Sequence, residues 1–170
     1  MVSFHPLTPW TLDVRYQIEQ IAAGMADMDA LEIFGLRPLD HDGENVVSDI
    51  AQIIRNGALI DGFVATRDVD GAAVPFAVAL AFRGTMPNVA DLAMFGRKGH
   101  ARAMPAVYRE LFSRSITFGP RHDIKMAQVP VLAKHRAARR MLRSVGGREV
   151  FDYGPIGPYR LSYIHTIWSF

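Results

Sequence analysis

Three apolar segments joined by two turns occupy residues 58–95, and this pattern constrains the fold more than any other feature. The segments are Ala58–Thr66, Val74–Phe82 and Val89–Phe95. Between the first two lies Asp70-Gly71, a dipeptide typical of a tight β-hairpin turn. The second turn contains Gly84, Pro87 and Asn88. Because such short connections join antiparallel neighbours, the pattern predicts a three-stranded antiparallel meander.

Segments with helical periodicity lie on both sides of the meander. Before it we expect a strand at Val2–Leu7 and then a helix, with Thr8 as its N-cap and Pro9 in its first turn. A short helix follows at Asp27–Phe34, and an apolar helical stripe lies at Val46–Ile54. Between these two we expect a loop through Gly35, Pro38 and Asp40–Gly43. After it we expect a helix within Ala101–Phe118, a strand at Ile124–Pro130, a helix at Ala133–Val145, and strands at Glu149–Tyr153 and Tyr159–His165.

The order of these elements, β-α-α-β-β-β-α-β-α-β-β, predicts one mixed α/β (α+β) domain over residues 1–170. We expect a mostly antiparallel sheet of about six to seven strands, with about four helices packed on it. A strand-helix-strand unit in the middle of the chain adds one right-handed crossover.

The composition excludes several classes of protein. Of the 170 residues, 49% are hydrophobic, which is incompatible with intrinsic disorder. The longest apolar run, Ala72–Phe82, is too short to cross a bilayer, and we identify no secretory signal after Met1, so we expect a cytoplasmic protein with no membrane partner. The absence of cysteine excludes disulfides, a thiolate nucleophile and a thiolate metal site. The six histidines show no spacing that suggests a metal.

Charge is distributed unevenly along the chain. Residues 1–96 contain 5 Lys/Arg and 13 Asp/Glu, whereas residues 97–148 contain 13 Lys/Arg and only Glu110 and Asp123 as acids. The basic stretch favours an anionic partner, such as a phosphate on a cofactor or on nucleic acid. A solvated basic face is the alternative that charge alone leaves open.

The segment Gly96-Arg97-Lys98-Gly99-His100-Ala101-Arg102 lies between a predicted strand and a predicted helix. Its small residues allow a ligand to approach the backbone closely, and the free amides at a helix N-terminus favour an anion. The three cationic side chains add full positive charge. The segment therefore predicts a site for a phosphate or diphosphate, with a solvated turn as the alternative.

This segment resembles the pyrophosphate-binding loop of the GNAT superfamily of acetyl-CoA-dependent N-acetyltransferases, which reads Gln/Arg-x-x-Gly-x-Gly/Ala. Gly99 matches the first glycine and Ala101 the small residue, and Arg102 begins a matching basic–Ala–apolar continuation. Gly96 occupies the position of the leading Gln/Arg, with Arg97 one residue later. The order of the elements also resembles that of the family from Val2 onward.

A second resemblance lies in the last predicted helix, which in the family reads Asn-x-x-Ala, then a tyrosine four residues on, then Gly-Phe. His135 stands in place of the asparagine, and Ala138 and Gly146 match. Leu142 occupies the position of the tyrosine, which in active relatives protonates the departing CoA thiolate. Because leucine has no proton to donate, the resemblance supports the fold more than the reaction.

The resemblance implies a set of site residues. Acetyl-CoA or another acyl-CoA would be held by the loop Gly96, Arg97, Lys98, Gly99, His100, Ala101 and Arg102, by the amides near Met94 and Phe95, and by His135. The fourth and fifth strands would splay apart to admit the thioester. Asp91 is the candidate base for the acceptor amine, a small molecule or a protein, with a solvent-facing residue as the alternative.

Two classes of function stay open at this stage. The first is an N-acyltransferase that transfers the acyl group directly. The second is a catalytically inactive structural or interaction protein, or a nucleic-acid-binding module; the chain also resembles acetyltransferase-like proteins of tailed phages and prophages. Nucleic acid is disfavoured as a partner because Tyr108, Phe112 and Phe118 fall on the apolar side of their helix.

The apolar C-terminal segment Tyr163–Phe170 is either a homodimer interface or a packed last strand.

Overall fold

The computed structural model describes residues 1–34 and 43–170, so the loop predicted at Gly35, Pro38 and Asp40 lies outside the described residues. The strands are β1 (Val2–Pro6), β2 (Leu59–Val69), β3 (Ala72–Arg83), β4 (Val89–Gly96), β5 (Met126–Leu132), β6 (Arg148–Ile156) and β7 (Leu161–Ser169). The helices are α1 (Leu12–Ala23), α2 (Asp27–Phe34), α3 (Gly43–Arg55), α4 (Met104–Arg121) and α5 (Arg136–Ser144).

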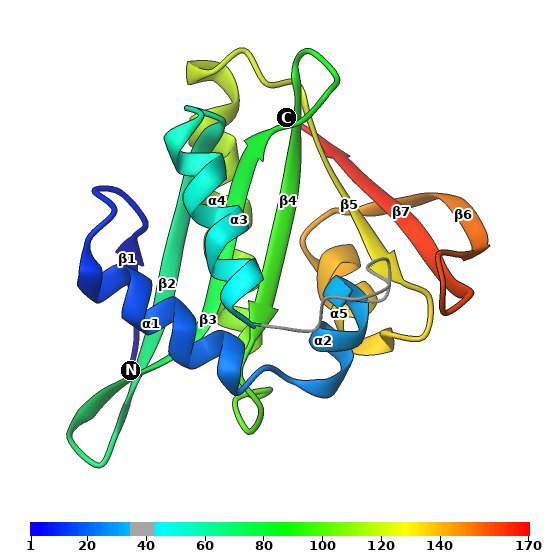
Figure 1. The fold of residues 1–170 in the computed structure, drawn as a ribbon. Coiled ribbons are helices and arrows are strands. Elements are labelled where there is room, and N and C mark those ends of the chain that lie inside the picture. Colours follow the sequence, from blue (N-terminus) through cyan, green and yellow to red (C-terminus); the bar gives the residue numbers. More distant parts are fainter. Residues whose placement is uncertain (35–42) are drawn as a thin grey trace.

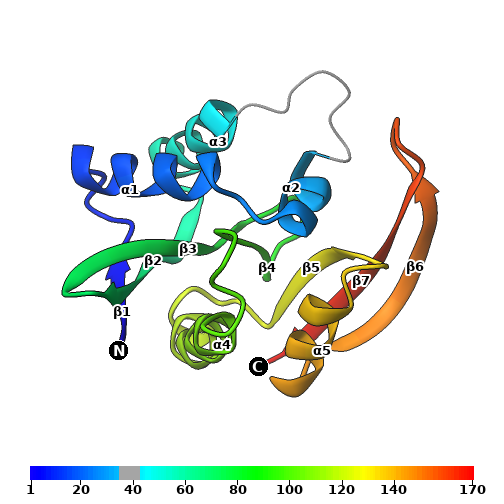
Figure 2. The ribbon, with the colours of Figure 1, turned by 90° about the horizontal axis from the view of Figure 1, so that it is seen from below.

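The strands form one sheet in the order β1-β2-β3-β4-β5-β7-β6 (Figure 1). All neighbouring pairs are antiparallel except β4 and β5, which are parallel and are connected through α4. Helices α1, α2 and α3 cover one face of the sheet, and α4 and α5 cover the other (Figure 2). The sequence-based prediction of a mixed, mostly antiparallel α/β domain is confirmed.

Each face of the sheet has its own apolar core. Under α4 and α5, the core contains Phe63, Phe76, Val107 and Trp168. Under α1 and α3, it contains Ile18, Ile50, Val64, Val78 and Phe95. Alternate residues of β2 and β3 thus point to opposite cores, which explains why the buried centres of both strands, Phe63–Ala65 and Phe76–Ala81, are apolar on both faces.

The meander predicted from residues 58–95 is present as β2, β3 and β4. Asp70 and Gly71 both have positive φ, at 54° and 83°, as a tight hairpin of this type requires. The ends of the strands and helices from β2 onward lie within three residues of the predicted ones, except that β7 continues to Ser169.

The N-terminal helices differ from the prediction. Thr11, not Thr8, caps α1, because the Thr11 side chain accepts a hydrogen bond from the Val14 amide at 3.2 Å. The apolar stripe Val46–Ile54 forms a helix of its own, α3, so the described residues contain five helices where about four were predicted.

The apolar C-terminal segment is a packed strand. β7 pairs with β5 on one side and with β6 on the other, and Tyr163, Ile164 and Trp168 are buried. Among the described residues, no helix combines the length and the apolar character that crossing a membrane would need.

Candidate active site

Strands β4 and β5 separate shortly after they meet. Their parallel ladder has three residue pairs and ends at Asp91↔Gln128. Beyond that point the two strands diverge (Figure 1). Directly after β5 the Ala133 amide donates to the Ser162 carbonyl of β7, whereas the Leu132 amide at the end of β5 points away from β7 and donates to Glu32. Because amides alternate along a strand, Pro130 lies on the same edge as Leu132 and has no N–H to offer β4 there.

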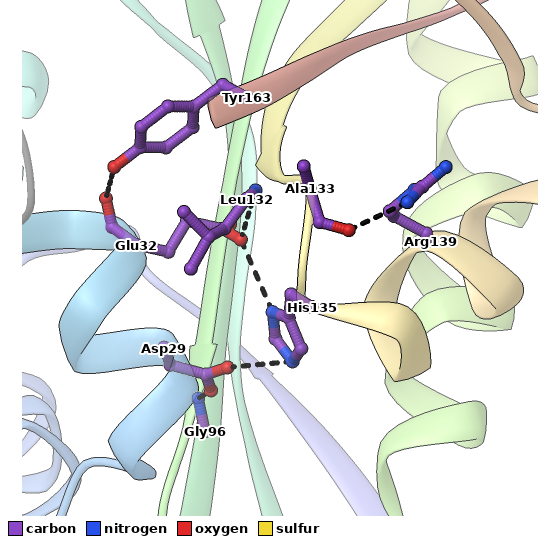
Figure 3. A network of polar contacts seen from close by, with 8 residues as sticks. All are labelled: Asp29, Glu32, Gly96, Leu132, Ala133, His135, Arg139 and Tyr163. Atoms are coloured by element: carbon purple, nitrogen blue, oxygen red, sulfur yellow. Dashed lines mark hydrogen bonds and ion pairs between the residues drawn. The ribbon is translucent and has the colours of Figure 1, made fainter. Parts of the chain in front are cut away.

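Helix α2 bridges the two separated strands (Figure 3). Its Asp29 carboxylate accepts a hydrogen bond from the Gly96 amide of β4 at 2.7 Å. One turn later, the Glu32 carboxylate accepts one from the Leu132 amide of β5 at 2.9 Å. The Tyr163 hydroxyl donates to the Glu32 carbonyl at 3.1 Å. Two of the backbone amides that the divergence leaves unpaired are thereby satisfied by carboxylates three residues apart on one helix.

His135, just before α5, lies between these two carboxylates (Figure 3). Its Nδ1 is 3.3 Å from Glu32 Oε2, and its Nε2 is 3.7 Å from Asp29 Oδ1. The three side chains are 14–19% exposed. We call this arrangement the Asp29–His135–Glu32 cluster.

Burial and charge shift the pKa values in this cluster. Burial raises the pKa of Asp29 to about 6, although the Gly96 hydrogen bond and the charge of His135 act in the opposite direction. Burial lowers the pKa of His135, but the hydrogen bond with Glu32 and the charges of both carboxylates outweigh it, so the pKa lies above its usual value. The cluster can therefore hold or release a proton near neutral pH.

A cavity of about 180 Å³ lies where β4 and β5 diverge, and we call it the splay cavity. Its lining includes Asp29 and Glu32 of α2, Met94 of β4, and Leu142 of α5. The Gly96 amide bonds to Asp29 while the Arg97 amide bonds to Phe76 of β3, so every second amide of β4 faces the divergence. The Met94 amide therefore points toward the splay cavity, and the Phe95 amide points toward β3.

The turn between β4 and α4 presents unpaired backbone amides. Within the described part of the chain, the amides of Gly99, His100, Ala101 and Arg102 have no hydrogen-bond acceptor. Gly99 has a φ of +86°, which favours glycine. No side chain caps α4, and Pro105 lies in its first turn. This end of the helix is thus available to an anion.

A second cavity, of about 410 Å³, lies between this turn and α5, and we call it the loop cavity. Arg97, Lys98 and Arg140 are among its lining residues. Asp29, Met104, Tyr108, His135 and Ala138 line both cavities, so the two are adjacent. Together they can hold an extended molecule with an anionic end at the turn and a reactive end between the strands.

Solved structures of acetyltransferases share this architecture. A protein assigned to the GNAT family from Desulfovibrio desulfuricans is 12% identical, with a TM-score of 0.70 over 99% of both chains. The spermidine N-acetyltransferase of Vibrio cholerae, in complex with CoA and spermine, is 12% identical, with a TM-score of 0.66 over 99% of this chain and 95% of that one. The ribosomal-protein-S18-alanine N-acetyltransferase of Escherichia coli is 14% identical, with a TM-score of 0.60 over 99% of this chain and 94% of that one.

The chain has the GNAT fold. No protein-family model matches its sequence, and no curated protein matches it either. At identities this low, the likeness establishes the fold and leaves the reaction to be argued from the residues. The similarity to phage proteins, the homodimer and the cytoplasmic location stay predictions.

The GNAT fold brings most of the predicted residues to the two cavities. Gly96, Arg97, Lys98, Gly99 and Ala101 line the loop cavity, Met94 lines the splay cavity, and His135 lines both.

Four predicted residues lie elsewhere. Phe95 is packed in the core under α1 and α3, and Arg102 is exposed outside both linings. The His100 ring stacks on Phe76 at 5.4 Å, and burial and two nearby arginines lower its pKa. Asp91 lies outside both linings and accepts a hydrogen bond from Gln128 at 2.6 Å.

Sequence reasoning missed Asp29, Glu32 and Tyr108. Asp29 and Glu32 are three residues apart on a short apolar helix, so their shared face was readable from the sequence. Tyr108 was assigned to the apolar face of its helix, and there it is 7% exposed. Its hydroxyl has no hydrogen-bond partner among the described residues and is not enclosed by protein. Burial and the charges of Asp29 and Glu32 raise its pKa.

Proposed function

We propose that this protein is an acyl-CoA-dependent N-acyltransferase that passes an acyl group directly from the thioester to an amine. One observation carries the proposal: a cavity at a cationic turn with free amides is adjacent to a cavity between two diverging strands. An acyl-CoA has a diphosphate and a thioester joined by a long arm, and the two cavities match these two ends in chemistry and order.

The residues of the turn fit a diphosphate. The four amides without acceptors, from Gly99 to Arg102, would donate to its oxygens. Arg97 and Lys98 line the same cavity and add positive charge. Lys98 also pairs with Asp27 at 3.1 Å, but both side chains are more than 70% exposed, so the pair is weak and the lysine is available.

The bound acyl-CoA would supply an acyl group activated as a thioester. The Met94 amide is the group that would donate a hydrogen bond to the thioester oxygen, where negative charge develops. In the reaction a C–N bond forms, the C–S bond breaks, the amine loses a proton and the sulfur gains one. The protein must therefore handle two protons.

The Asp29–His135–Glu32 cluster is suited to take the proton of the amine. A carboxylate with a pKa of about 6 is ionised at neutral pH and is a stronger base than an ordinary aspartate. Asp91, the base predicted from the sequence, lies on β4 outside the splay cavity. We therefore favour Asp29 over Asp91 as the base.

Tyr108 is suited to serve the departing sulfur. Tyr108 lines both cavities, and its hydroxyl has no partner among the described residues. Because its pKa is raised, the hydroxyl stays protonated over the working pH range. It would supply the hydrogen bond that Leu142, which lines the same cavity, lacks the chemistry to give.

The acceptor is an amine on a small molecule or a protein. The similar structures support this class, since one is a spermidine N-acetyltransferase and another a ribosomal-protein-alanine N-acetyltransferase. The acidic wall that α2 forms on the splay cavity would attract a protonated amine before it loses its proton.

Replacing Gly99 by valine tests the proposal. At a φ of +86° a β-branched side chain is strained, and it would also block the approach of a diphosphate to the amides. We expect Gly99→Val to weaken CoA binding at least tenfold in isothermal titration calorimetry. Gly71→Val is the matched control, because Gly71 has a φ of +83° and likewise has open space around it but lies in a distant hairpin.

The two variants should lose similar stability and differ only in CoA affinity. Equal CoA affinities in Gly99→Val and the wild type would remove the turn as the binding site. No CoA binding by the wild-type protein would reject the acyltransferase and favour the non-enzymatic interpretation.

A further inference from the structure

The two walls of the splay cavity differ in chemistry. On the side of α2 the wall carries Asp29 and Glu32, with His135 between them. On the side of α4 and α5 it is built from apolar side chains, namely Leu111, Ala138, Leu142 and Trp168, each less than 10% exposed. A charged amine and its proton are stabilised by the carboxylates of the first wall. Binding of a carbon chain against the second wall is favourable because it removes apolar surface from water.

The apolar wall continues into the core of the molecule. Leu111, Ala138, Leu142 and Trp168 belong to the core cluster between the sheet and the helices α4 and α5. A group that enters the cavity on this side is therefore surrounded by tightly packed apolar side chains. The only hydroxyl offered to it without a partner among the described residues is that of Tyr108.

The size of the splay cavity exceeds what an acetyl group needs. Its volume is about 180 Å³. For comparison, an apolar protein cavity of about 150 Å³ binds benzene, which has six carbons. An acetyl group has two carbons, so the cavity leaves room for several more atoms, which a longer acyl chain at the apolar wall and the acceptor amine at the acidic wall would share.

Leu142 contributes to this space and to its apolar character. It is 6% exposed and lines the cavity from α5. A tyrosine at this position, as the resemblance implies for active relatives, is bulkier and would place a polar hydroxyl in the apolar wall. Leucine adds no polar atom to the wall, and Tyr108 on the neighbouring helix is the lining residue that offers a hydroxyl without a partner among the described residues.

We propose that the splay cavity selects acyl-CoA substrates whose acyl group is an unbranched apolar chain of about four to six carbons rather than acetyl. The chain would lie against the wall of Leu111, Ala138, Leu142 and Trp168. This inference rests on the proposed function, because the cavity meets an acyl group only when CoA occupies the loop cavity.

Calorimetric titration of the full chain with CoA, acetyl-CoA, butyryl-CoA and hexanoyl-CoA tests the inference without an acceptor. Each methylene buried in an apolar site improves affinity roughly fourfold. We expect CoA and acetyl-CoA to bind alike, and butyryl-CoA, which has two more methylenes, to bind roughly fifteenfold more tightly than acetyl-CoA.

Variants that fill the cavity identify where the chain lies. We expect Leu142→Phe to bring the affinity for butyryl-CoA and hexanoyl-CoA down to that for acetyl-CoA, with CoA affinity unchanged. Leu111→Phe fills the same wall from α4, at a residue that does not line the loop cavity, and serves if Leu142→Phe folds poorly; retained CoA binding shows that a variant is folded. Ile116→Phe is the control, because Ile116 is an exposed residue of α4, 58% exposed, and does not line the cavity.

The outcomes separate this inference from the proposed function. If acetyl-CoA binds as tightly as the longer esters while CoA itself binds, the chain-length inference is wrong and the acyltransferase stands. If the preference exists but survives in Leu142→Phe and Leu111→Phe, the chain lies elsewhere and the inference is also wrong. If CoA and all esters fail to bind, both proposals are wrong.

Discussion

At the scale of single residues, Asp29 is a carboxyl whose pKa the structure raises strongly. This carboxyl is 14% exposed, and burial raises its pKa from 3.8 to about 6. The sequence predicted a carboxylate base but favoured Asp91, because the family that the chain resembles often carries a carboxylate on that strand. Burial and the proximity of His135 distinguish Asp29, and both arise from contacts that the linear sequence does not display.

The raised pKa of Asp29 predicts how stability depends on pH. Between about pH 4 and pH 6 the folded protein keeps a proton that the unfolded chain releases, so the free energy of unfolding falls as pH rises. A shift from 3.8 to about 6 corresponds to roughly 3 kcal/mol. Asp29→Asn should remove this decrease in the free energy of unfolding. The stability of the variant relative to the wild type should therefore rise as pH increases from about 4 to about 6.

Urea unfolding at pH 4, 5, 6 and 7 measures the effect. The raised pKa of His135 acts in a separate interval, because its contribution is fully present below pH 6.5 and is lost above it. Asp27→Asn is the control, since Asp27 lies on the same helix but is 81% exposed. Parallel pH profiles for the wild type and Asp29→Asn would show that Asp29 is an ordinary carboxylate.

At the scale of elements, local patterns predicted what is local. Turn chemistry at Asp70-Gly71 located the hairpin, and apolar periodicity located α4, β5 and α5 within three residues. Such patterns could not predict the hydrogen bonds that Asp29 and Glu32 accept, because these bonds join residues 67 and 100 positions apart in the sequence. The divergence of β4 and β5 was expected only through the resemblance, and Pro130 supplies its physical reason.

The bridge that α2 makes between the diverging strands can be tested at Glu32. In Glu32→Ala the Leu132 amide loses its acceptor, which should cost about 1–3 kcal/mol of stability. Hydrogen exchange at the Leu132 amide should accelerate strongly. Glu32→Gln keeps an acceptor oxygen and should preserve slow exchange, while Glu19→Ala breaks only an exposed pair on α1 and should cost less than about 0.5 kcal/mol.

These exchange rates decide whether α2 holds the splay cavity in shape. Unchanged exchange at Leu132 in Glu32→Ala would mean that β5 keeps its conformation without α2. In that case the Asp29–His135–Glu32 cluster would have a role in proton transfer alone.

At the scale of the whole molecule, the uneven charge of the sequence becomes a difference between faces. The basic stretch 97–148 folds into the turn, α4, β5 and α5, and α5 contains four arginines and no acidic residue. Helices α4 and α5 share one face of the sheet, opposite α1, α2 and α3 (Figure 2). The sequence predicted an anionic partner for this stretch but could not tell that Arg97, Lys98 and Arg140, which come from opposite ends of it, line one cavity.

A long-range field of this kind should act on the rate at which CoA arrives. Arg143 on α5 is exposed and lines neither cavity, so Arg143→Glu changes the field without removing a contact. We expect the association rate constant for CoA in stopped-flow measurements to fall roughly two- to fivefold at low salt, with the dissociation rate constant unchanged. The difference from the wild type should shrink as salt is added, because screening shortens the reach of the charge.

Arg55→Glu is the matched control, because it reverses the same charge on an exposed residue of α3, on the opposite face. It should leave both rate constants close to those of the wild type. Equal slowing by the two variants would mean that CoA responds to net charge alone. A slower association in Arg143→Glu only would show that the basic face guides the anion to the turn after β4, as the separation of charge between the faces requires.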